Sequence, residues 1–233
     1  IPTVPYIEIK DIEDLKSVNA NFFPAILKTR KLGYDGKGQY IINSLKEIPE
    51  IPKNDYILEK KINLQQEISI IAVRYQDGTI FTYQPIENVH KDQILFKSYS
   101  PANSNQSIIE EAKNHAVNFA KKISYVGTFC LEFFITDKNE LLLNEIAPRV
   151  HNSGHLTIES YNVSQFESHL RSVCDLEKIK PLLRYKSEMT NILGEDIYNY
   201  RDKEFKKDEY FHDYYKKESK IGRKMGHFTK ILT

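Results

Sequence analysis

The sequence has few cysteines and no long apolar run. Its 233 residues include only two cysteines, Cys130 and Cys174, which do not form a CxxC pair. So few cysteines are typical of a protein from a reducing compartment with buried thiols, and not of a disulfide-rich secreted protein. No apolar stretch approaches the ~20 residues of a membrane span, and no signal-peptide pattern opens the chain. These absences predict a cytoplasmic protein.

Net charge is also nearly absent. The 33 lysines and arginines almost cancel the 32 aspartates and glutamates, so the composition predicts no general polyanion-binding surface and argues against nucleic acid as a partner. The length suits one large domain, or one domain with a small appendage. The chain opens with Ile1-Pro2-Thr3 and lacks an initiator methionine, which suggests a fragment of a longer protein.

Two β-forming runs place two carboxylates against an apolar background. Thr128–Thr136 and Leu141–Ile146 have the residues of strands, and polar turn residues separate them. With Lys138-Asn139 as the loop, Glu132 lies directly opposite Glu145. Like charges facing each other across strands need a positive charge between them, and Mg²⁺ is commonly held by one or two carboxylates plus substrate phosphates. We therefore interpret the glutamates as a Mg²⁺ pair. The alternative is a solvated strand face with two unrelated acids, because a shift of one residue would turn one side chain away.

A polar segment directly follows the second glutamate. It carries a guanidinium on Arg149, imidazoles on His151 and His155, an amide on Asn152 and a hydroxyl on Ser153. The planar fork of the arginine suits a small oxyanion such as carboxylate, bicarbonate or phosphate. Taken singly, each histidine is more often a structural hydrogen-bonding group than a catalyst. This density of polar groups is unusual for a plain loop and indicates a binding site.

Three glycines lie between two predicted strands near the start of the chain. Phe23–Thr29 and Tyr40–Asn43 are the strands, and Gly33, Gly36 and Gly38 lie between them, where they would let backbone N–H groups approach phosphate oxygens. A dinucleotide fingerprint or a P-loop needs a helix after the glycines, and a strand follows here instead. The pattern favours a mobile flap, although three nearby glycines alone could also be an ordinary turn.

Further strands and a polar C-terminal region complete the predicted β-structure. Tyr56–Glu59 is a short strand, and Gln66–Arg74 pairs with Thr79–Pro85 across the turn signal Asp77-Gly78. Residues 198–220 are crowded with tyrosines, lysines and acids. Because the acids balance the bases there, a small solvated β appendage is favoured over a nucleic-acid surface.

Two helices are predicted from capping boxes and apolar periodicity. Ser107 with Glu110 opens the first helix, and Ser164 with Glu167 opens the second. The residues expected to face the core share a helical spacing; they are Ile109, Ala112, Ala116, Phe119, Ala120 and Ile123 in the first helix, and Phe166, Leu170 and Val173 or Cys174 in the second. Both helices are expected to support the fold without taking part in chemistry.

Several motifs together resemble one enzyme family. NEIAPRVHNSGH is similar to the NEIAPRPHNSGH signature of the N5-carboxyaminoimidazole ribonucleotide synthetases, and YDGKGQ and GRKMGH match two further motifs of that family in the expected order. Val150 stands where the family usually has proline, which only loosens a rigid turn. The resemblance implies an α+β ATP-grasp fold in which two subdomains, 1–62 and 63–180, grip ATP, followed by a small C-terminal β domain, 181–233.

The resemblance also implies a role for each site residue. For ATP it implies Lys28 and His90 on the phosphates, Glu59, Lys60 and Ile62 at adenine, Glu67 at ribose, and Gly33, Tyr34, Gly36, Gly38 and Gln39 in a covering loop. It implies Glu132 and Glu145 on the metal, Asp35, Lys37, Arg149 and His151 in catalysis, and Asn152, Ser153, Arg223 and Lys224 on the substrate. Many ATP-grasp relatives have a third metal ligand, an asparagine, where this chain has Ala147, so two carboxylates are expected to hold the metal.

The implied reaction uses ATP, Mg²⁺ and bicarbonate. Carboxyphosphate forms first, and the exocyclic amine of 5-aminoimidazole ribonucleotide is then carboxylated, a step of purine biosynthesis. A homodimer is usual in the family, and its members carry a further N-terminal domain that this chain lacks. That difference leaves two alternatives: a truncated ATP-grasp core that binds Mg-ATP without turnover, or another ATP-grasp ligase such as a biotin carboxylase-like enzyme.

Overall fold

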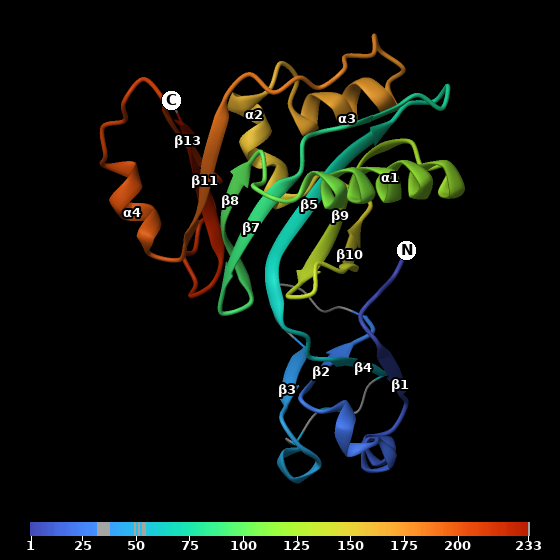
Figure 1. Cartoon of the computed structure of the whole chain (residues 1–233). Coiled ribbons are helices and arrows are strands. Elements are labelled where there is room, and N and C mark those ends of the chain that lie inside the picture. The colour runs from blue at the N-terminus through green and yellow to red at the C-terminus, as the bar shows by residue number, and fades with distance from the viewer. Residues whose placement is uncertain (32–37, 49, 51, 53–54, 233) are drawn as a thin grey trace.

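The chain folds into two antiparallel sheets of unequal size, the smaller one at the bottom of Figure 1. The computed structural model describes residues 1–31, 38–48, 50, 52 and 55–232. The small sheet holds β1 (Tyr6–Ile9), β2 (Ala25–Thr29), β3 (Gln39–Ile42) and β4 (Tyr56–Lys60). The large sheet holds β5 (Leu64–Arg74), β6 (Ile80–Thr82), β7 (Ile86–Lys91), β8 (Ile94–Ser100), β9 (Gly127–Thr136), β10 (Leu141–Ala147), β11 (Lys186–Leu193), β12 (Glu209–Asp213) and β13 (Lys224–Leu232). The helices are α1 (Gln106–Ile123), α2 (Thr157–Ser160), α3 (Gln165–Val173) and α4 (Asp196–Arg201), with short 3₁₀ turns η1 (Ile12–Ser17), η2 (Ala20–Phe22), η3 (Leu45–Glu47) and η4 (Asn152–Leu156).

The small sheet has the strand order β1-β4-β2-β3. Because successive side chains of a strand point to opposite faces, Leu27 of β2 joins an apolar cluster with Leu58 of β4, and Leu15 of η1 covers that cluster. The neighbouring residue Lys28 lies on the other face of the sheet, where it lines a pocket. The alternation thus separates the core of this sheet from its functional face.

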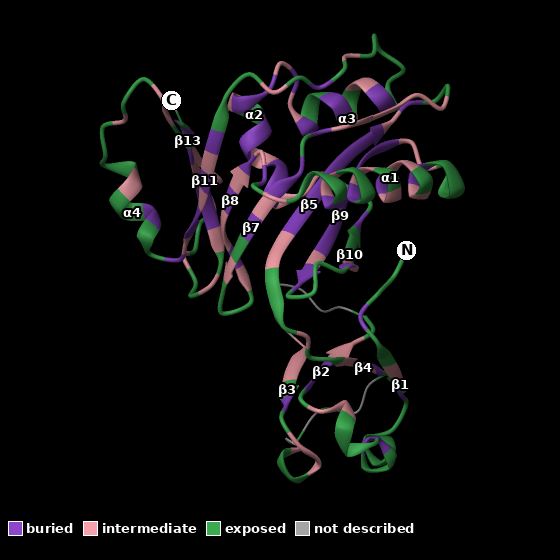
Figure 2. Ribbon diagram, viewed as in Figure 1, coloured by how far each residue is buried: buried purple, intermediate pink, exposed green. Residues whose placement is uncertain are grey.

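The large sheet runs in the order β10-β9-β5-β7-β8-β11-β13-β12, with β6 paired to β5. Phe129, Leu131 and Phe133 of β9 pack into the main core against α1, and Glu132 therefore lies on the opposite face. Figure 2 shows the buried residues concentrated in these strands and along the inner sides of the helices. The two helices α1 and α3 cover opposite faces of the sheet, so β9 is covered on both sides.

The N-cap of helix α1 lies two residues before the predicted one. Asn105, and not Ser107, is the N-cap, and its side chain accepts a hydrogen bond from the Ser107 backbone at 3.0 Å. The residues buried against the sheet follow i, i+4 spacing and are Ile108, Ala112, Ala116 and Ala120. Ile123 was expected in the core and is 46% exposed, because it is the last helical residue before the left-handed Ser124 turns the chain away.

Helix α3 has its predicted cap at Ser164, but the predicted inner face is wrong. Its buried residues are Gln165, Ser168 and Ser172. The residues expected inside, Phe166, Leu170, Val173 and Cys174, are exposed. His169 of the same helix accepts a hydrogen bond from the Thr128 backbone N–H at 3.1 Å. Small polar residues face the sheet because the helix packs close to β9 and hydrogen-bonds to it, which leaves its apolar face in solvent.

In the β9–β10 hairpin Glu132 pairs with Glu145 as predicted, but the loop length differs from the prediction and a β-bulge compensates for it. The loop holds three residues and not the predicted two, because the Thr136 backbone N–H donates to the Glu140 carbonyl and Asn139 adopts φ 60°. That loop alone would shift the pairing by one residue. A β-bulge between Leu143 and Glu145 inserts one residue into β10 and brings Glu145 directly opposite Glu132.

The C-terminal residues extend the large sheet. β11 pairs with β8 on one side and with β13 on the other, and β13 pairs with β12. The expected hairpin of β5 and β6 is present, with Gly78 at φ 88° in its loop. No helix in the described part of the chain is long and apolar enough to cross a membrane. The subdomain boundaries after residues 62 and 180 stay predictions.

Candidate functional site

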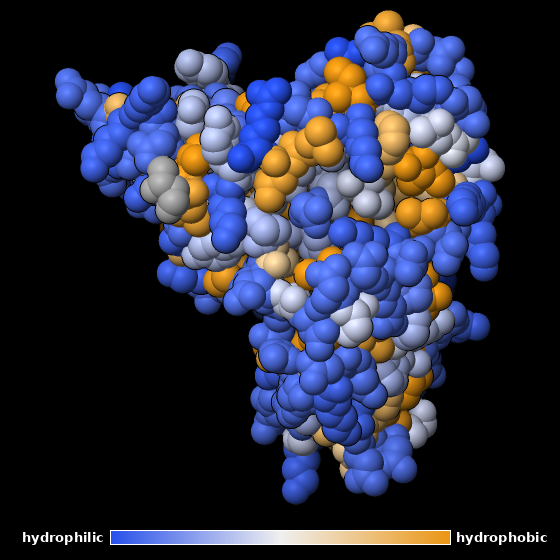
Figure 3. All heavy atoms as spheres, turned by 45° about the horizontal axis from the view of Figure 1, so that its top comes forward, coloured by the Kyte–Doolittle hydropathy of each residue, from blue (hydrophilic) through white to orange (hydrophobic). Residues whose placement is uncertain are grey.

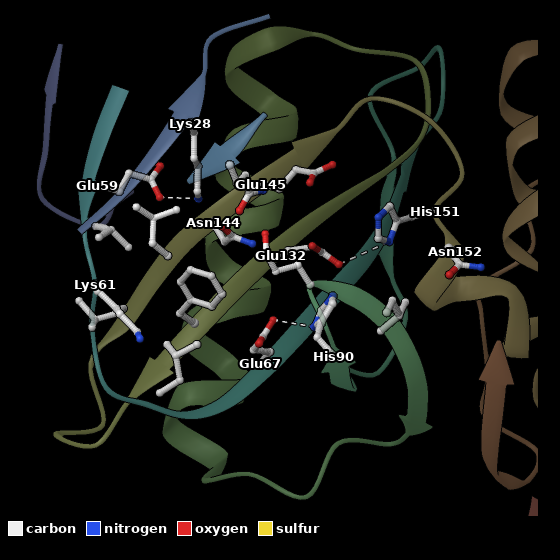
Figure 4. Close-up of a pocket in the computed structure, with 18 of the residues that line it drawn as sticks. Lys28, Glu59, Lys61, Glu67, His90, Glu132, Asn144, Glu145, His151 and Asn152 are labelled. Atoms are coloured by element: carbon white, nitrogen blue, oxygen red, sulfur yellow. Dashed lines mark ion pairs between the residues drawn. The ribbon is translucent and has the colours of Figure 1, made fainter. Parts of the chain in front are cut away.

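A pocket of about 640 Å³ lies between the two sheets. Its lining includes side chains from β2, β3 and β4 of the small sheet and from β5, β7, β9 and β10 of the large one (Figure 4). The residues expected from the sequence that line it are Lys28, Gln39, Glu59, Lys60, Ile62, Glu67, His90, Glu132, Glu145, Arg149, His151, Asn152 and Lys224. Residues separated by almost two hundred positions therefore share one cavity.

The two glutamates of the hairpin differ in their exposure. Glu132 is 8% exposed, whereas Glu145 is exposed. Burial raises the pKa of Glu132 to about 7, and the neighbouring charge of Glu145 adds to the effect. The Ser69 hydroxyl donates to Glu132 at 3.3 Å, and Asn88 in turn hydrogen-bonds to that serine. The buried carboxylate is thus held in place from β5 and β7.

This carboxylate pair fits a hard divalent cation. Two acids in direct register repel each other, and the raised pKa of Glu132 expresses that repulsion together with its burial. Carboxylate oxygens are the ligands that Mg²⁺ uses in proteins, and basic side chains line the same pocket. Cys130 and His151 also offer donor atoms within 4.8 Å of each other and of Glu132, but burial raises the pKa of this thiol well above its usual value. The carboxylates are therefore the ligands suited to magnesium.

Two pairs of oppositely charged or chargeable side chains lie in the pocket walls, one in each sheet (Figure 4). Lys28 of β2 pairs with Glu59 of β4, and His90 Nδ1 of β7 lies 2.9 Å from a Glu67 carboxylate oxygen of β5. Burial lowers the pKa of His90, but contact with Glu67 and the charge of Glu132 outweigh it, so that the pKa of His90 is raised. Each pair thus places a basic side chain beside an acid in the pocket wall.

The segment after β10 brings a cation and a neutral imidazole to the same pocket. Arg149 lies exposed at its rim and donates to the Val150 carbonyl at 2.9 Å. His151 Nδ1 lies 2.9 Å from the Ser153 hydroxyl and 3.6 Å from a Glu132 oxygen. Burial, followed by the charge of Arg149, lowers the pKa of His151 to about 3. His151 is therefore neutral at physiological pH.

Three further expected residues, Ser153, Arg223 and Gly38, are described by the structure but do not line the pocket. Ser153 is buried behind His151, and Arg223 lies exposed beside Lys224, donating to the Glu218 carbonyl at 3.0 Å. Gly38 has φ 78°, and a Cβ there would lie 2.5 Å from the Thr29 hydroxyl, so this position requires glycine. The other expected flap residues, Gly33, Tyr34, Asp35, Gly36 and Lys37, lie outside the described residues.

The pocket also has lining residues that the sequence did not suggest. They are Val4, Ile26, Lys61, Leu64, Gln93, Leu95, Phe134 and Asn144. Five of these eight are apolar residues with no chemical signature. Asn144 precedes Glu145, so regular alternation would turn it away from the pocket, and the bulge at this point brings it in. A bulge of one residue has no signal in this stretch of sequence.

Comparisons with known proteins agree with this geometry. The family model described as ATP-grasp domain matches residues 1–166, and the one described as phosphoribosylaminoimidazole carboxylase C-terminal domain matches residues 187–233. The N5-carboxyaminoimidazole ribonucleotide synthase of Bacillus subtilis (strain 168) is 40% identical over 231 residues, which are 97% of this chain and 61% of the relative. A synthase of the same name from Staphylococcus aureus is also 40% identical, over 99% of this chain and 63% of the relative. The chain thus spans less than two thirds of these relatives.

Solved structures give the same result. The ADP complex of an N5-carboxyaminoimidazole ribonucleotide synthetase superposes with a TM-score of 0.93 at 35% identity, covering 100% of this chain and 63% of that one. The Aspergillus clavatus synthase, solved with ADP and 5-aminoimidazole ribonucleotide, gives 0.88 at 30% identity, covering 100% and 64%. The chain therefore belongs to the ATP-grasp family, with the C-terminal domain of the phosphoribosylaminoimidazole carboxylases at its end.

Proposed function

We propose that this chain carries the catalytic core of an ATP-dependent carbon–nitrogen ligase. The reaction is the bicarbonate-dependent carboxylation of 5-aminoimidazole ribonucleotide to N5-carboxyaminoimidazole ribonucleotide, through carboxyphosphate, in purine biosynthesis. The observation that carries the proposal is the in-register pair Glu132 and Glu145 in a pocket that also contains Lys28, Arg149 and Lys224. The names of relatives at 40% identity support the substrate.

The nucleotide is assigned to the part of the pocket nearest the small sheet. Glu59, Lys60 and Ile62 would contact adenine, and Glu67 would accept hydrogen bonds from the ribose. Lys28 would exchange its partner Glu59 for phosphate oxygens, since an ion pair in a pocket wall can open to a charged ligand. Mg²⁺, held by the glutamate pair, would neutralise charge on the β- and γ-phosphates.

The acceptor side is assigned to the segment after β10 and to β13. Arg149, whose fork faces a neighbouring carbonyl on one side only, would hold bicarbonate. Neutral His151 can accept a hydrogen bond or donate one without bringing a second positive charge to the site. Arg223 and Lys224 would bind the ribonucleotide phosphate, and Asp35 and Lys37 of the flap would help to exclude water from a labile intermediate.

The test is ADP release from Mg-ATP and bicarbonate, measured with and without 5-aminoimidazole ribonucleotide on a sample of verified intact mass. Stimulation by the ribonucleotide supports the proposed reaction and means that these residues suffice for it. Nucleotide binding without stimulation supports the alternative of an ATP-grasp core that does not turn over. Stimulation by a different acceptor, such as biotin, would instead identify another ligase of the family.

We also propose a cytoplasmic homodimer. Both cysteines are free, which suits a reducing compartment, although only Cys130 is buried as expected and Cys174 is exposed. The exposed apolar residues on α3 support a contact surface, and they include Phe166, Leu170 and Val173. Figure 3, in which the α3 side comes forward, has hydrophobic residues grouped among hydrophilic ones on that face. A second copy packing α3 against α3 would bury these side chains.

A further inference from the structure

We infer that Asn191, Tyr214 and His227 are positioning residues, which orient the site loop, residues 151–156, through a connected chain of hydrogen bonds whose donors and acceptors are defined. The three residues come from β11, from the connection after β12 and from β13. They therefore belong to the C-terminal strands and not to the hairpin that carries the metal ligands. The inference about catalysis rests on the proposed function, but the hydrogen-bond chain itself does not.

A backbone carbonyl fixes the first two side chains. Asn191, which is 2% exposed, donates from Nδ2 to the Leu95 carbonyl at 2.9 Å. A carbonyl accepts and never donates, so the amide nitrogen of Asn191 must face it. The same nitrogen donates to Asn152 Oδ1 at 2.6 Å, and Asn152 Nδ2 donates back to Asn191 Oδ1 at 3.0 Å. The orientation of both amides thus follows from Leu95.

The orientation of Asn152 then sets the protons on the next groups. Its second amide hydrogen points to His155 Nδ1 at 3.4 Å, which makes that nitrogen an acceptor. The Tyr214 hydroxyl, 2.9 Å from the same nitrogen, must donate to it. A tyrosine has a single hydroxyl proton, so its oxygen accepts from His227 Nδ1 at 2.8 Å. The chain therefore runs from His227 through Tyr214 to His155.

Burial keeps these groups neutral, as the chain requires. Burial lowers the pKa of His155 to about 4 and that of His227 to about 2. Burial also raises the pKa of the Tyr214 hydroxyl, so that it retains its proton. With its Nδ1 protonated, His227 leaves a bare Nε2 that has no hydrogen-bond partner among the described residues. The ring stacks on His212 at 4.4 Å between centroids.

The network limits what Asn152 can do in the pocket. Both of its amide hydrogens and one lone pair of its oxygen are already engaged, so it can offer a ligand only one further lone pair. Tyr214 also donates its backbone N–H to the Met225 carbonyl at 3.0 Å, next to Lys224 of the pocket. The same side chains thus tie the site loop to the strand that carries Lys224. Asn191, Tyr214 and His227 do not line the pocket themselves.

The proton order is tested by NMR of chain labelled with ¹⁵N only in histidine. The two ring nitrogens have different shifts when protonated and bare, so each tautomer can be read directly. We expect His155 to carry its proton on Nε2 and His227 to carry its proton on Nδ1, and both signals to change in Tyr214→Phe. A proton on Nδ1 of His155, or unchanged signals in the variant, would overturn the hydrogen-bond chain.

The positioning role is tested by kinetics on Tyr214→Phe and Asn191→Asp. Asp at position 191 cannot donate to the Leu95 carbonyl or to Asn152, so it removes both of these hydrogen bonds while it keeps the shape of the side chain. Loss of an outer hydrogen bond that orients a site typically costs about tenfold or more, so we expect kcat/KM for the ribonucleotide to fall about tenfold in each variant, with KM for ATP unchanged. Tyr161→Phe, which removes a buried hydroxyl bonded to Ser100 outside the network, is the matched control.

The outcomes separate the two proposals. Equal losses in Tyr161→Phe, or equal effects on ATP and ribonucleotide, would mean a general loss of stability and would overturn the positioning role. If the unaltered chain shows no response to the ribonucleotide, the proposed function fails. The histidine tautomers then still decide the hydrogen-bond chain, and dissociation constants for the ribonucleotide, measured by calorimetry on the same variants, take the place of kcat/KM.

Discussion

At the scale of single residues, the pocket contains ionisable groups whose burial differs sharply. Glu132 is almost fully buried and its pKa is raised to about 7, whereas Glu145, its partner across the hairpin, is exposed. His151 is held neutral with its Nδ1 3.6 Å from a Glu132 oxygen. A cation between the two acids would remove their repulsion and return Glu132 to its charged form.

Glu145→Gln should therefore abolish ADP formation while leaving the fold intact, because the variant keeps the shape of the side chain and removes one metal-binding charge. We expect at least a hundredfold lower turnover, on the order of the loss of a main charge-stabilising group. Glu140→Gln, in the same hairpin but outside the pocket lining, is the control. Near-normal turnover in Glu145→Gln would refute the metal assignment.

Acid should destabilise the folded chain through its buried histidines. Burial lowers the pKa values of His151, His155 and His227 from 6.5 to about 3, about 4 and about 2. Below about pH 6.5 the unfolded chain binds protons at these sites and the folded chain does not, so the free energy of unfolding falls as the pH falls, by up to about 1.4 kcal/mol per pH unit for each histidine. Between about pH 5 and pH 6, Glu132 with its raised pKa is protonated in the folded chain but not in the unfolded chain, so it cancels the pH slope contributed by one of the three histidines.

Urea unfolding at a series of pH values between about 6 and 5 measures this slope, the range in which the unfolded histidines are charged. His227→Gln should reduce the slope by about one histidine's share, even though it also lowers stability. A stability that is flat or rises on acidification would contradict the assigned protonation states.

At the scale of elements, two irregularities depart from the regular pattern of the sequence. The bulge in β10 restores the pairing of Glu145 with Glu132 and adds Asn144 to the pocket. Helix α3 packs its small polar face on the sheet and exposes Leu170, which is 59% accessible, beside Phe166. The first irregularity places two residues in the pocket, and the second leaves an exposed apolar face on α3, which is the surface of the proposed dimer.

Leu170→Lys should weaken the proposed dimer by placing a charge in the middle of the apolar face of α3. The side chain is exposed in the single chain, so thermal stability of the monomer should change little. Sedimentation at several concentrations should show a shift towards monomer. Ile123→Lys, on the exposed end of α1, is the matched control. Equal mass in both variants would exclude α3 as the contact.

At the scale of the whole molecule, the pocket couples the two sheets. Lys28 and Glu59 come from the small sheet, and Glu67 and Glu132 come from the large one. A ligand that touches both groups can bind fully only when the sheets keep this arrangement, so binding should stabilise the whole chain against unfolding.

Mg-ADP at a hundred times its dissociation constant should add about 2.7 kcal/mol to the free energy of unfolding. For a chain of this size that corresponds to a rise of about 5 to 10 °C in Tm. Differential scanning fluorimetry measures the shift, and EDTA should remove most of it. Lys28→Ala should show a smaller shift, since it lacks the expected phosphate contact. An unchanged Tm at saturating Mg-ADP would contradict nucleotide binding in this pocket.

Much of the fold and the site is encoded locally. Alternation of apolar residues predicted β9 and β10, and the motif after them predicted Arg149, His151 and Asn152, all of which line the pocket. Such features depend on residues a few positions apart, which is why composition and spacing reveal them. The roles of individual residues stay predictions that the experiments above test.

What the tertiary structure decided depends on contacts between distant parts of the chain. The inner face of α3 was set by its close approach to β9, which overrode its apolar periodicity. Asn191 and Tyr214 meet the site loop only because β11 and β13 join the large sheet. The neutral histidines and the raised pKa of Glu132 likewise arise from burial, which no local pattern specifies. The sequence by itself thus determined the family and the chemistry of the pocket, and packing decided the orientation and the charge of its side chains.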